Sequence, residues 1–151
     1  MATFMAKWSP DYPGQSGHIH ISMTKADDGS SVFYDPNQPH QMSKAMTQFV
    51  SGQQMLMPQL LAMVSPTINS YSRLIPGFWA PTHSAWGVEN RTTALRVING
   101  SASAQRVEYR VAAADGNPYL ALAAAIGSGL WGIENQVNPV APIVGNASEQ
   151  S

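Results

Sequence analysis

The sequence predicts an α+β fold in which short antiparallel strands pack against helices. First, polar and apolar side chains alternate with a period of two in three segments, which is typical of half-buried strands. Second, apolar side chains recur at helical spacing after two good N-cap residues, Ser43 and Asn117. The alternating segments are residues 18–23, 92–98 and 105–111.

Further elements are expected in the N-terminal half. Residues 2–6 are a short apolar run that predicts a strand, and residues 31–35 could be the return strand of a hairpin. Gly52 is expected to interrupt the helix that begins after Ser43, because glycine disfavours helix interiors. A second helix is then expected over residues 54–64, with Pro58 in its first turn, where proline is tolerated.

The C-terminal half combines a loop, strands and a helix. Residues 65–87 predict a long irregular loop, and such loops within a compact domain are usually functional. Pro118 follows the Asn117 cap at the first helical position, and the helix is expected to end near Glu134. We therefore expect one domain over residues 1–137 and a loose tail rich in Pro, Ala and Ser over 138–151.

Composition narrows the class of protein. Hydrophobic residues make up 44% of the 151 residues, enough for a core, but charged residues make up only 11%, less than half the share of about 25% in soluble domains. The shortage of charged residues favours an oligomer or a piece of a larger fold.

A net charge of −1 provides no overall field that would attract nucleic acid or an anionic membrane. No apolar run is long enough to span a membrane. The absence of cysteine and of a secretory signal fits a cytoplasmic protein.

The arginines are concentrated in one stretch. All of them fall between Arg73 and Arg110, and guanidiniums bind phosphate and carboxylate groups in a bidentate manner. The alternative is a set of unrelated surface arginines. Arg106, Glu108 and Arg110 share one face of a predicted strand. Glu108 could form a structural ladder with the arginines, or it could hold a hard cation while they bind the anion that the cation neutralises.

Two histidines and two further arginines add to this pattern. His18 and His20 share a strand face, a spacing that suits a metal ion or a phosphate, although many such pairs are ordinary strand residues. Arg91 and Arg96 could clamp a phosphoryl group or a carboxylate. The sequence contains neither a Walker loop nor a nucleophile elbow.

Four motifs follow one another along the chain. They are PGQSGHIHIS (13–22), SPTINSYSRLIPGFWAP (65–81), AWGVENRTTALRV (85–97) and RVEYRVAAADGNPYLALAA (106–124). In this order they resemble the glutamine synthetase family over residues 2–135. The resemblance implies the C-terminal part of that family's catalytic domain. It further implies ligation of glutamate to ammonia or a small amine, with ATP as co-substrate, Mg²⁺ or Mn²⁺ as cofactor, a γ-glutamyl phosphate intermediate and a homo-oligomeric, dodecamer-like parent.

The resemblance also implies a role for individual residues. Metal, nucleotide, glutamate and the transferred phosphoryl group each have a set of matching positions. These are His18 and Glu108 for the metal; His20, Ser22 and Arg106 for the nucleotide; Gly14, Arg73 and Arg110 for glutamate; and Arg91 and Arg96 as catalytic residues at the phosphoryl group.

The chain departs from the family pattern at Trp79. Members that use ammonia have a glutamate there, which helps to bind and deprotonate ammonium. An indole offers only cation–π attraction. Trp79 therefore favours an alkyl amine, such as methylamine or a polyamine, as the second substrate. The alternative is that Trp79 only packs the loop and ammonia is still used.

The chain is also shorter than the family's enzymes. Their β-grasp domain and the acidic segment that supplies most metal ligands are absent from it. We therefore expect little or no ligase activity and weak metal binding from this chain alone. Two other hypotheses are a non-catalytic structural relative and an unrelated barrel protein with a histidine pair. The retained His18, Glu108 and arginines argue against the first, and the long loop motif argues against the second.

Overall fold

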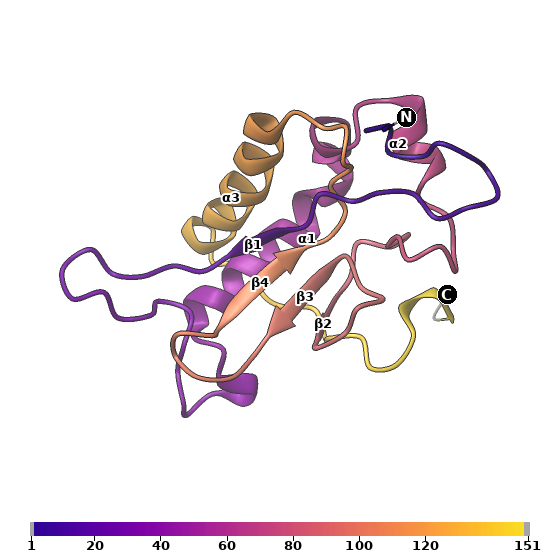
Figure 1. Ribbon diagram of the computed structural model, residues 1–151. Helices are drawn as coiled ribbons and strands as arrows, with labels where there is room; N and C mark the ends of the chain where they lie inside the picture. The colour runs from indigo at the N-terminus through magenta and orange to yellow at the C-terminus, as the bar shows by residue number, and fades with distance from the viewer. Residues whose placement is uncertain (1, 150–151) are drawn as a thin grey trace.

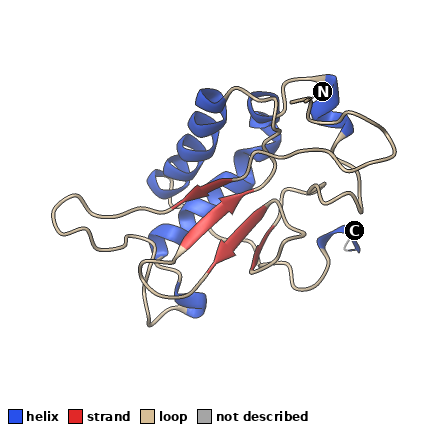
Figure 2. Ribbon diagram, in the orientation of Figure 1, coloured by secondary structure: helices blue, strands red, loops and turns tan. Residues whose placement is uncertain are grey.

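The computed structural model describes residues 2–149, and it confirms the expected α+β class. One four-stranded sheet packs against helices α1 and α3, which lie side by side on one of its faces (Figures 1 and 2). The strands are β1 (Ile19–Ile21), β2 (Trp86–Val88), β3 (Leu95–Ile98) and β4 (Arg106–Tyr109). The helices are α1 (Lys44–Val64), α2 (Ile68–Ser72) and α3 (Pro118–Glu134), with 3₁₀ turns at Pro39–Gln41 and Ala147–Glu149.

The sheet has the order β1-β4-β3-β2. β4 pairs antiparallel with both β1 and β3, as the alternating segments predicted, whereas β2 pairs parallel with β3. The connection between β2 and β3 closes through Glu89, which has a left-handed φ of 50°. The side chain of Asn90 then accepts a hydrogen bond from the backbone N–H of Thr92 at 3.0 Å. This tight connection places Glu89 beside the centre of the sheet.

The strand register separates a polar row from an apolar row. His20 pairs with Glu108, which in turn lies opposite Arg96. One position along, Ile21, Val107 and Val97 form the matching row on the other face, because successive side chains point to opposite sides of a strand. The apolar row belongs to a core that also contains Phe33, Phe49 and Met46 from the α1 side. The sheet thus has one face in the core and one face that carries charged groups.

Helix α1 is continuous, so the expected interruption at Gly52 is wrong. A Cβ atom on Gly52 would lie 2.4 Å from the backbone oxygen of Ser128 and 2.6 Å from the Cα of Gly132, both in α3. Gly132 is equally confined, with the oxygen of Gln48 only 2.2 Å from its own hypothetical Cβ. The two glycines therefore allow the helix backbones to touch. That close packing outweighs the roughly 1 kcal/mol propensity cost of a helical glycine.

Pro58 lies inside α1 and not in the first turn of a second helix, so that expectation is also wrong. Proline has no N–H to donate to the carbonyl of residue 54. The hydroxyl of Ser84 donates a hydrogen bond to the Gln54 oxygen instead. The loop that precedes β2 therefore repairs the gap in the helix ladder.

Helix α3 begins and ends where the sequence predicted. Asn117 is its N-cap, Pro118 its first residue and Glu134 its last. The long loop of 65–87 is partly structured, because α2 forms within it through a capping box between Thr67 and Ser70. No helix of the described chain has the length and apolar character needed to cross a membrane.

Two strand predictions in the N-terminal half are wrong. Within the described chain, residues 2–6 form no strand, and residues 31–35 form only isolated bridges, from Ser31 to Thr24 and from Tyr34 to Met42. Both segments are loops.

The described part of the segment after Asn138 contacts β2. The N–H of Ile143 donates to the Trp86 oxygen at 2.8 Å, and the Trp86 indole N–H donates to the Val140 oxygen at 2.8 Å. Ala147 is buried, and its N–H donates to the hydroxyl of Thr92. Backbone groups of this segment thus pair along the edge strand β2.

Candidate functional site

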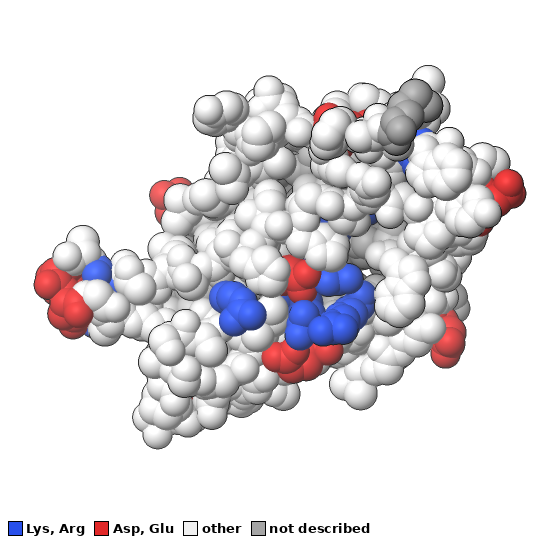
Figure 3. Space-filling view, in the orientation of Figure 1, with Lys and Arg blue, Asp and Glu red and all other residues white. Residues whose placement is uncertain are grey.

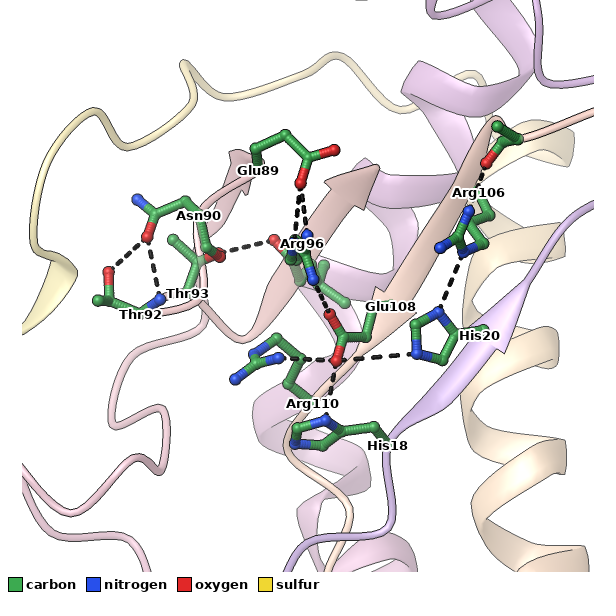
Figure 4. Close-up of polar contacts among 12 residues, drawn as sticks. His18, His20, Glu89, Asn90, Thr92, Thr93, Arg96, Arg106, Glu108 and Arg110 are labelled. Atoms are coloured by element: carbon green, nitrogen blue, oxygen red, sulfur yellow. Dashed lines mark hydrogen bonds and ion pairs between the residues drawn. The ribbon is translucent and has the colours of Figure 1, made fainter. Parts of the chain in front are cut away.

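The centre of the polar face is the carboxylate of Glu108, which is only 3% exposed. Its Oε1 accepts a hydrogen bond from Arg110 Nη1 at 2.7 Å and lies 2.8 Å from His18 Nδ1. Its Oε2 accepts from Arg96 Nη1 at 3.2 Å (Figure 4). Three elements thus aim cationic or donor groups at one buried anion. We call these four residues the Glu108 cluster.

The strand register explains why the cluster forms. Arg96 and Glu108 face each other directly across β3 and β4, and Arg110 follows Glu108 on the same face. His18 comes just before β1, next to the position that pairs with Tyr109. The His18–Glu108 and Arg96–Glu108 contacts therefore follow from strand pairing and not from flexible loops.

The surroundings of Glu108 keep it ionised. Burial alone would raise the pKa of Glu108, but the charges of Arg110 and His18 and the hydrogen bond from Arg96 outweigh it and lower this pKa below 4.5. The pKa of His18 is lowered below 6.5 by burial and by Arg110, although Glu108 opposes the shift. His18 is therefore neutral near pH 7, the form in which a histidine can coordinate a metal.

Arg96 contacts a second carboxylate that the sequence did not reveal. Its Nε donates to Glu89 Oε2 at 3.2 Å and its Nη2 to the same oxygen at 2.5 Å. Burial would lower the pKa of Arg96, but Glu89 and Glu108 together raise it. Glu89 stands in the ENRTTALR segment, but its contact with Arg96 depends on the parallel pairing of β2 with β3, which had not been predicted.

Arg106 and His20 extend the polar face toward the other end of β4. Arg106 Nε donates to His20 Nδ1 at 3.3 Å, and its Nη1 donates to the Ala104 oxygen at 2.8 Å. His20 Nε2 lies 3.8 Å from Glu108 Oε1, a looser contact than that of His18. Ser22 is exposed just past β1, and its hydroxyl forms no hydrogen bond with any described residue.

Arg73 lies in a different environment, packed under the loop of Gly14. It is 1% exposed; its Nη1 donates to Ser16 Oγ at 2.7 Å and its Nη2 to the Val111 oxygen at 2.5 Å. A Cβ atom on Gly14 would lie 2.5 Å from Arg73 Cγ, so only glycine fits above this side chain. Burial lowers the pKa of Arg73. The structure thus brings Gly14 and Arg73 together; two guanidinium nitrogens bond to internal partners, whereas Nε is buried and has no partner among the described residues.

Trp79 and Arg91 lie together at a second position. Both line a hollow of about 170 Å³ that is completed by the tail around Asn146. The loop that carries Trp79 is anchored by its neighbour Phe78, whose ring lies 4.3 Å from the ammonium of Lys7. Arg91 forms no ion pair with any residue in 2–149.

The donor set fits a divalent cation in kind but not in number. Glu108 offers carboxylate oxygens, which Mg²⁺ and Mn²⁺ prefer, and His18 offers a neutral imidazole. Within residues 2–149, however, no group of three or more such side chains is arranged to hold a metal ion. His18 and Glu108 could therefore provide only part of a coordination sphere.

The charged side chains of this face gather in one place. Figure 3 shows lysine or arginine atoms grouped with carboxylate atoms near the middle of the view, surrounded by uncharged surface. Arg96, Arg106 and Arg110 outnumber the carboxylates of Glu89 and Glu108 in the described site. This sheet face therefore carries more guanidiniums than carboxylates, and a guanidinium is the side-chain group that binds carboxylate and phosphate in a bidentate manner.

The comparisons identify the family. The chain belongs to the glutamine synthetase family, because the model of the family's catalytic domain matches residues 1–151. It is 46% identical to type-1 glutamine synthetase 2 of Dictyostelium discoideum over 148 residues. The matched region makes up 97% of this chain and 28% of the relative.

Two amine-using relatives are similarly close. Identity is 45% to the glutamate–isopropylamine ligase of a Pseudomonas species, over 99% of this chain and 32% of the relative. It is 42% to the gamma-glutamylputrescine synthetase of Escherichia coli, over 99% of this chain and 31% of the relative. The chain thus spans about a third of the length of the curated relatives it matches.

Proposed function

We propose that this chain supplies the arginine-rich part of the active site of an ATP-dependent ligase that joins glutamate to ammonia or a small amine through a γ-glutamyl phosphate. The observation that carries the proposal is the Glu108 cluster, in which a buried carboxylate holds Arg96, Arg110 and His18 on one face of the sheet. Phosphoryl transfer depends on positioning and on neutralising charge, and this cluster offers both.

The cluster has donors left over for an anionic substrate. The Nε of Arg110 is buried and has no hydrogen-bond partner among the described residues. A buried donor without a partner is costly, so a carboxylate or phosphoryl oxygen that reached it would be stabilised. We assign Arg110, with Gly14 and Arg73, to glutamate. Arg96 and Arg91 are assigned to the transferred phosphoryl group.

The nucleotide and the metal take the neighbouring positions. His20 and Arg106 lie side by side at the end of β4, and Ser22 follows on β1's side, so we assign these three to the nucleotide. His18 and Glu108 would hold a Mg²⁺ or Mn²⁺ ion, whose charge would help to neutralise the phosphates. Since the described chain supplies only these partial ligands, we expect metal binding by the isolated chain to be weak.

The nitrogen donor is proposed to be an alkyl amine or polyamine rather than ammonia. Trp79 has neither charge nor a basic atom with which to bind ammonium and accept its proton, whereas its ring can contact an alkyl chain. Trp79 is 77% exposed and thus available to a ligand. Two relatives with similar identity bear the names of amine ligases.

We also propose that the protein works in a homo-oligomer. Only 11% of its residues are charged. Helix α3 exposes a stripe of large apolar side chains, at Tyr119, Leu122, Ile126 and Leu130. Surfaces of this kind usually contact other protein.

A pair of chimeras tests the proposal. This chain would replace the matching segment of the Dictyostelium glutamine synthetase in one and of the Pseudomonas isopropylamine ligase in the other. Phosphate release and γ-glutamyl product are then measured with ammonium and with methylamine. We expect ATP-dependent product in both hosts, and faster turnover with methylamine.

The outcomes separate the alternatives. Faster turnover with ammonium in both hosts would end the amine assignment but keep the ligase. Folded chimeras without any product would favour a non-catalytic relative. The isolated chain should form no product at all, and measurable ligation by it would contradict the expectation that it needs further segments.

A further inference from the structure

We infer that the hollow beside Trp79 binds the organic part of a primary amine with an uncharged tail, and that it disfavours diamines and polyamines. The inference rests on the proposed ligase function and narrows its substrate class. It starts from the charges that line the hollow, which differ from those a polyamine would need.

Three segments that are distant in the sequence build this hollow. Trp79 and Ala80 come from the loop before β2, Arg91 and Thr92 from the connection to β3, and Asn146 and Ser148 from the tail. Its volume of about 170 Å³ suits a small molecule. Arg91, which we assign to the transferred phosphoryl group, forms part of its wall. An amine tail in the hollow would therefore lie next to the proposed site of acyl transfer.

Trp79 is held in a conformation that large residues rarely adopt. Its φ is 62° and that of Gly77 is 81°, both in the left-handed region. A bulky residue keeps such a conformation only where its surroundings impose it, and such positions cluster at functional sites. The preceding residue, Phe78, contacts the ammonium of Lys7 with its ring. The indole of Trp79 lines the hollow and is exposed, so it can pack against an alkyl chain.

The hollow is suited to one amino group and not to two. Arg91 is the one charged side chain among the described residues that line it, and none of these carries a carboxylate. The reacting nitrogen must be neutral to attack a carbonyl carbon, and a nearby guanidinium lowers the pKa of a bound ammonium. A second ammonium at the far end of the substrate would meet the same guanidinium without a counter-ion.

The polar groups of the hollow are neutral. Thr92, Asn146 and Ser148 cannot neutralise a cation. The Thr92 and Ser148 hydroxyls donate to Asn90 Oδ1 at 2.6 Å and Asn146 Oδ1 at 2.8 Å, and they keep a lone pair that can accept from the hydroxyl of a ligand. The neighbouring Glu149 does not line the hollow, and its Oε1 accepts a hydrogen bond from Asn146 Nδ2 at 2.7 Å. The favoured ligands are therefore short alkyl amines and hydroxyalkyl amines.

The indole N–H signals of the 151-residue chain provide a direct test. A ¹⁵N-labelled sample is titrated at pH 8 and constant ionic strength with isopropylamine, ethanolamine or putrescine. Trp8, which is exposed, stacks on Tyr12 and does not line the hollow, serves as an internal control. We expect a saturable shift of the Trp79 signal with both monoamines. Putrescine should bind roughly fivefold more weakly, the effect of two unit charges about 4 Å apart in a water-like dielectric.

Arg91→Gln is the matched variant. It should remove most of the difference between isopropylamine and putrescine, because it removes the repelling charge and keeps a polar side chain at this position. Putrescine binding as tightly as the monoamines to the unaltered chain would overturn the inference. So would a Trp79 signal that no amine shifts, or shifts equal to those of Trp8. These readouts involve no catalysis, so a failure of ligation in the chimeras would be distinguishable from a failure of amine binding.

Discussion

Replacing the buried carboxylate by its neutral isostere, Glu108→Gln, tests whether the charged cluster is a stabilising unit. The carboxylate accepts hydrogen bonds from Arg96 and Arg110 and lies against His18. Removing one partner of a buried ion pair costs about 3–5 kcal/mol, and the amide keeps one acceptor oxygen, so we expect a loss of about 3 kcal/mol. For a chain of this size that loss corresponds to a fall in Tm of roughly 6–12 °C.

The assay is equilibrium unfolding in guanidinium chloride, followed by far-UV circular dichroism in a buffer with a chelator, so that metal ions play no part. Glu89→Gln is the matched control. It makes the same chemical change on the other side of the Arg96 guanidinium, but the Glu89 side chain is 45% exposed. An exposed ion pair is worth less than about 1 kcal/mol, so this variant should unfold close to the unaltered chain.

A different ranking would refute the reasoning. If Glu108→Gln cost no more than Glu89→Gln, the buried cluster would not be a stabilising centre. If Glu108→Gln raised the stability, the cluster would cost free energy in the folded chain. That cost would be expected of a site held ready for an anionic substrate or a cation.

Gly132→Ala should destabilise the chain by about 1–3 kcal/mol through overpacking. Gly127 lies in the same helix with open space around it, so Gly127→Ala should stabilise the chain by up to about 1 kcal/mol. Thermal unfolding of the two variants measures both effects. Burial would raise the pKa of Asp115, but hydrogen bonds from two hydroxyls lower it below 3.8. Its contribution to the free energy of unfolding is therefore complete above pH 3.8 and is lost as the pH falls through the folded-state pKa. Asp115→Asn should abolish this loss when the free energy of unfolding is measured as a function of pH. Lys7→Met should speed amide hydrogen exchange around Phe78 roughly threefold to tenfold, as the loss of a cation–π contact implies.

Each of these predictions has an outcome that contradicts it. Equal effects of the two alanine substitutions would mean that the glycine contact between α1 and α3 can relax. An Asp115→Asn profile that still falls below pH 3.8 by the same amount would assign that loss to other carboxyl groups. For Lys7, the conservative variant Lys7→Arg keeps the cation and should leave exchange unchanged; faster exchange in both variants would point to packing instead of charge.

The elements of the fold were predictable where one local signal dominated. Asn117 and Pro118 fix the start of α3, and alternating side chains locate β3 and β4. Gly52 and Pro58 misled the prediction because their local propensities are overridden from outside the helix. Gly52 packs against Gly132 of α3, and the Gln54 oxygen that Pro58 leaves without a donor accepts a hydrogen bond from the distant Ser84. Neither partner can be found from residues near it in the sequence.

The candidate site was predictable to the extent that it follows strand periodicity. Placing Glu108 and Arg110 on one face brought the centre of the cluster within reach of the sequence, and His18 and Arg96 followed from the motif resemblance. Glu89 was missed because its approach to Arg96 needs a parallel pairing through a left-handed turn. The internal partners of Arg73 also depend on the way in which distant loops close over it, which no periodicity encodes.

The two rows of the sheet share one pairing register, and this has a practical consequence. If β4 paired one residue out of step, Glu108 would face the core around Phe33 and Val107 would face the arginines. Such a molecule would lose its interior packing and its charged centre at the same time. Misregistered material in a purified sample should therefore be recognisable by aggregation or a lowered melting temperature, and molecules that melt normally should carry an intact centre.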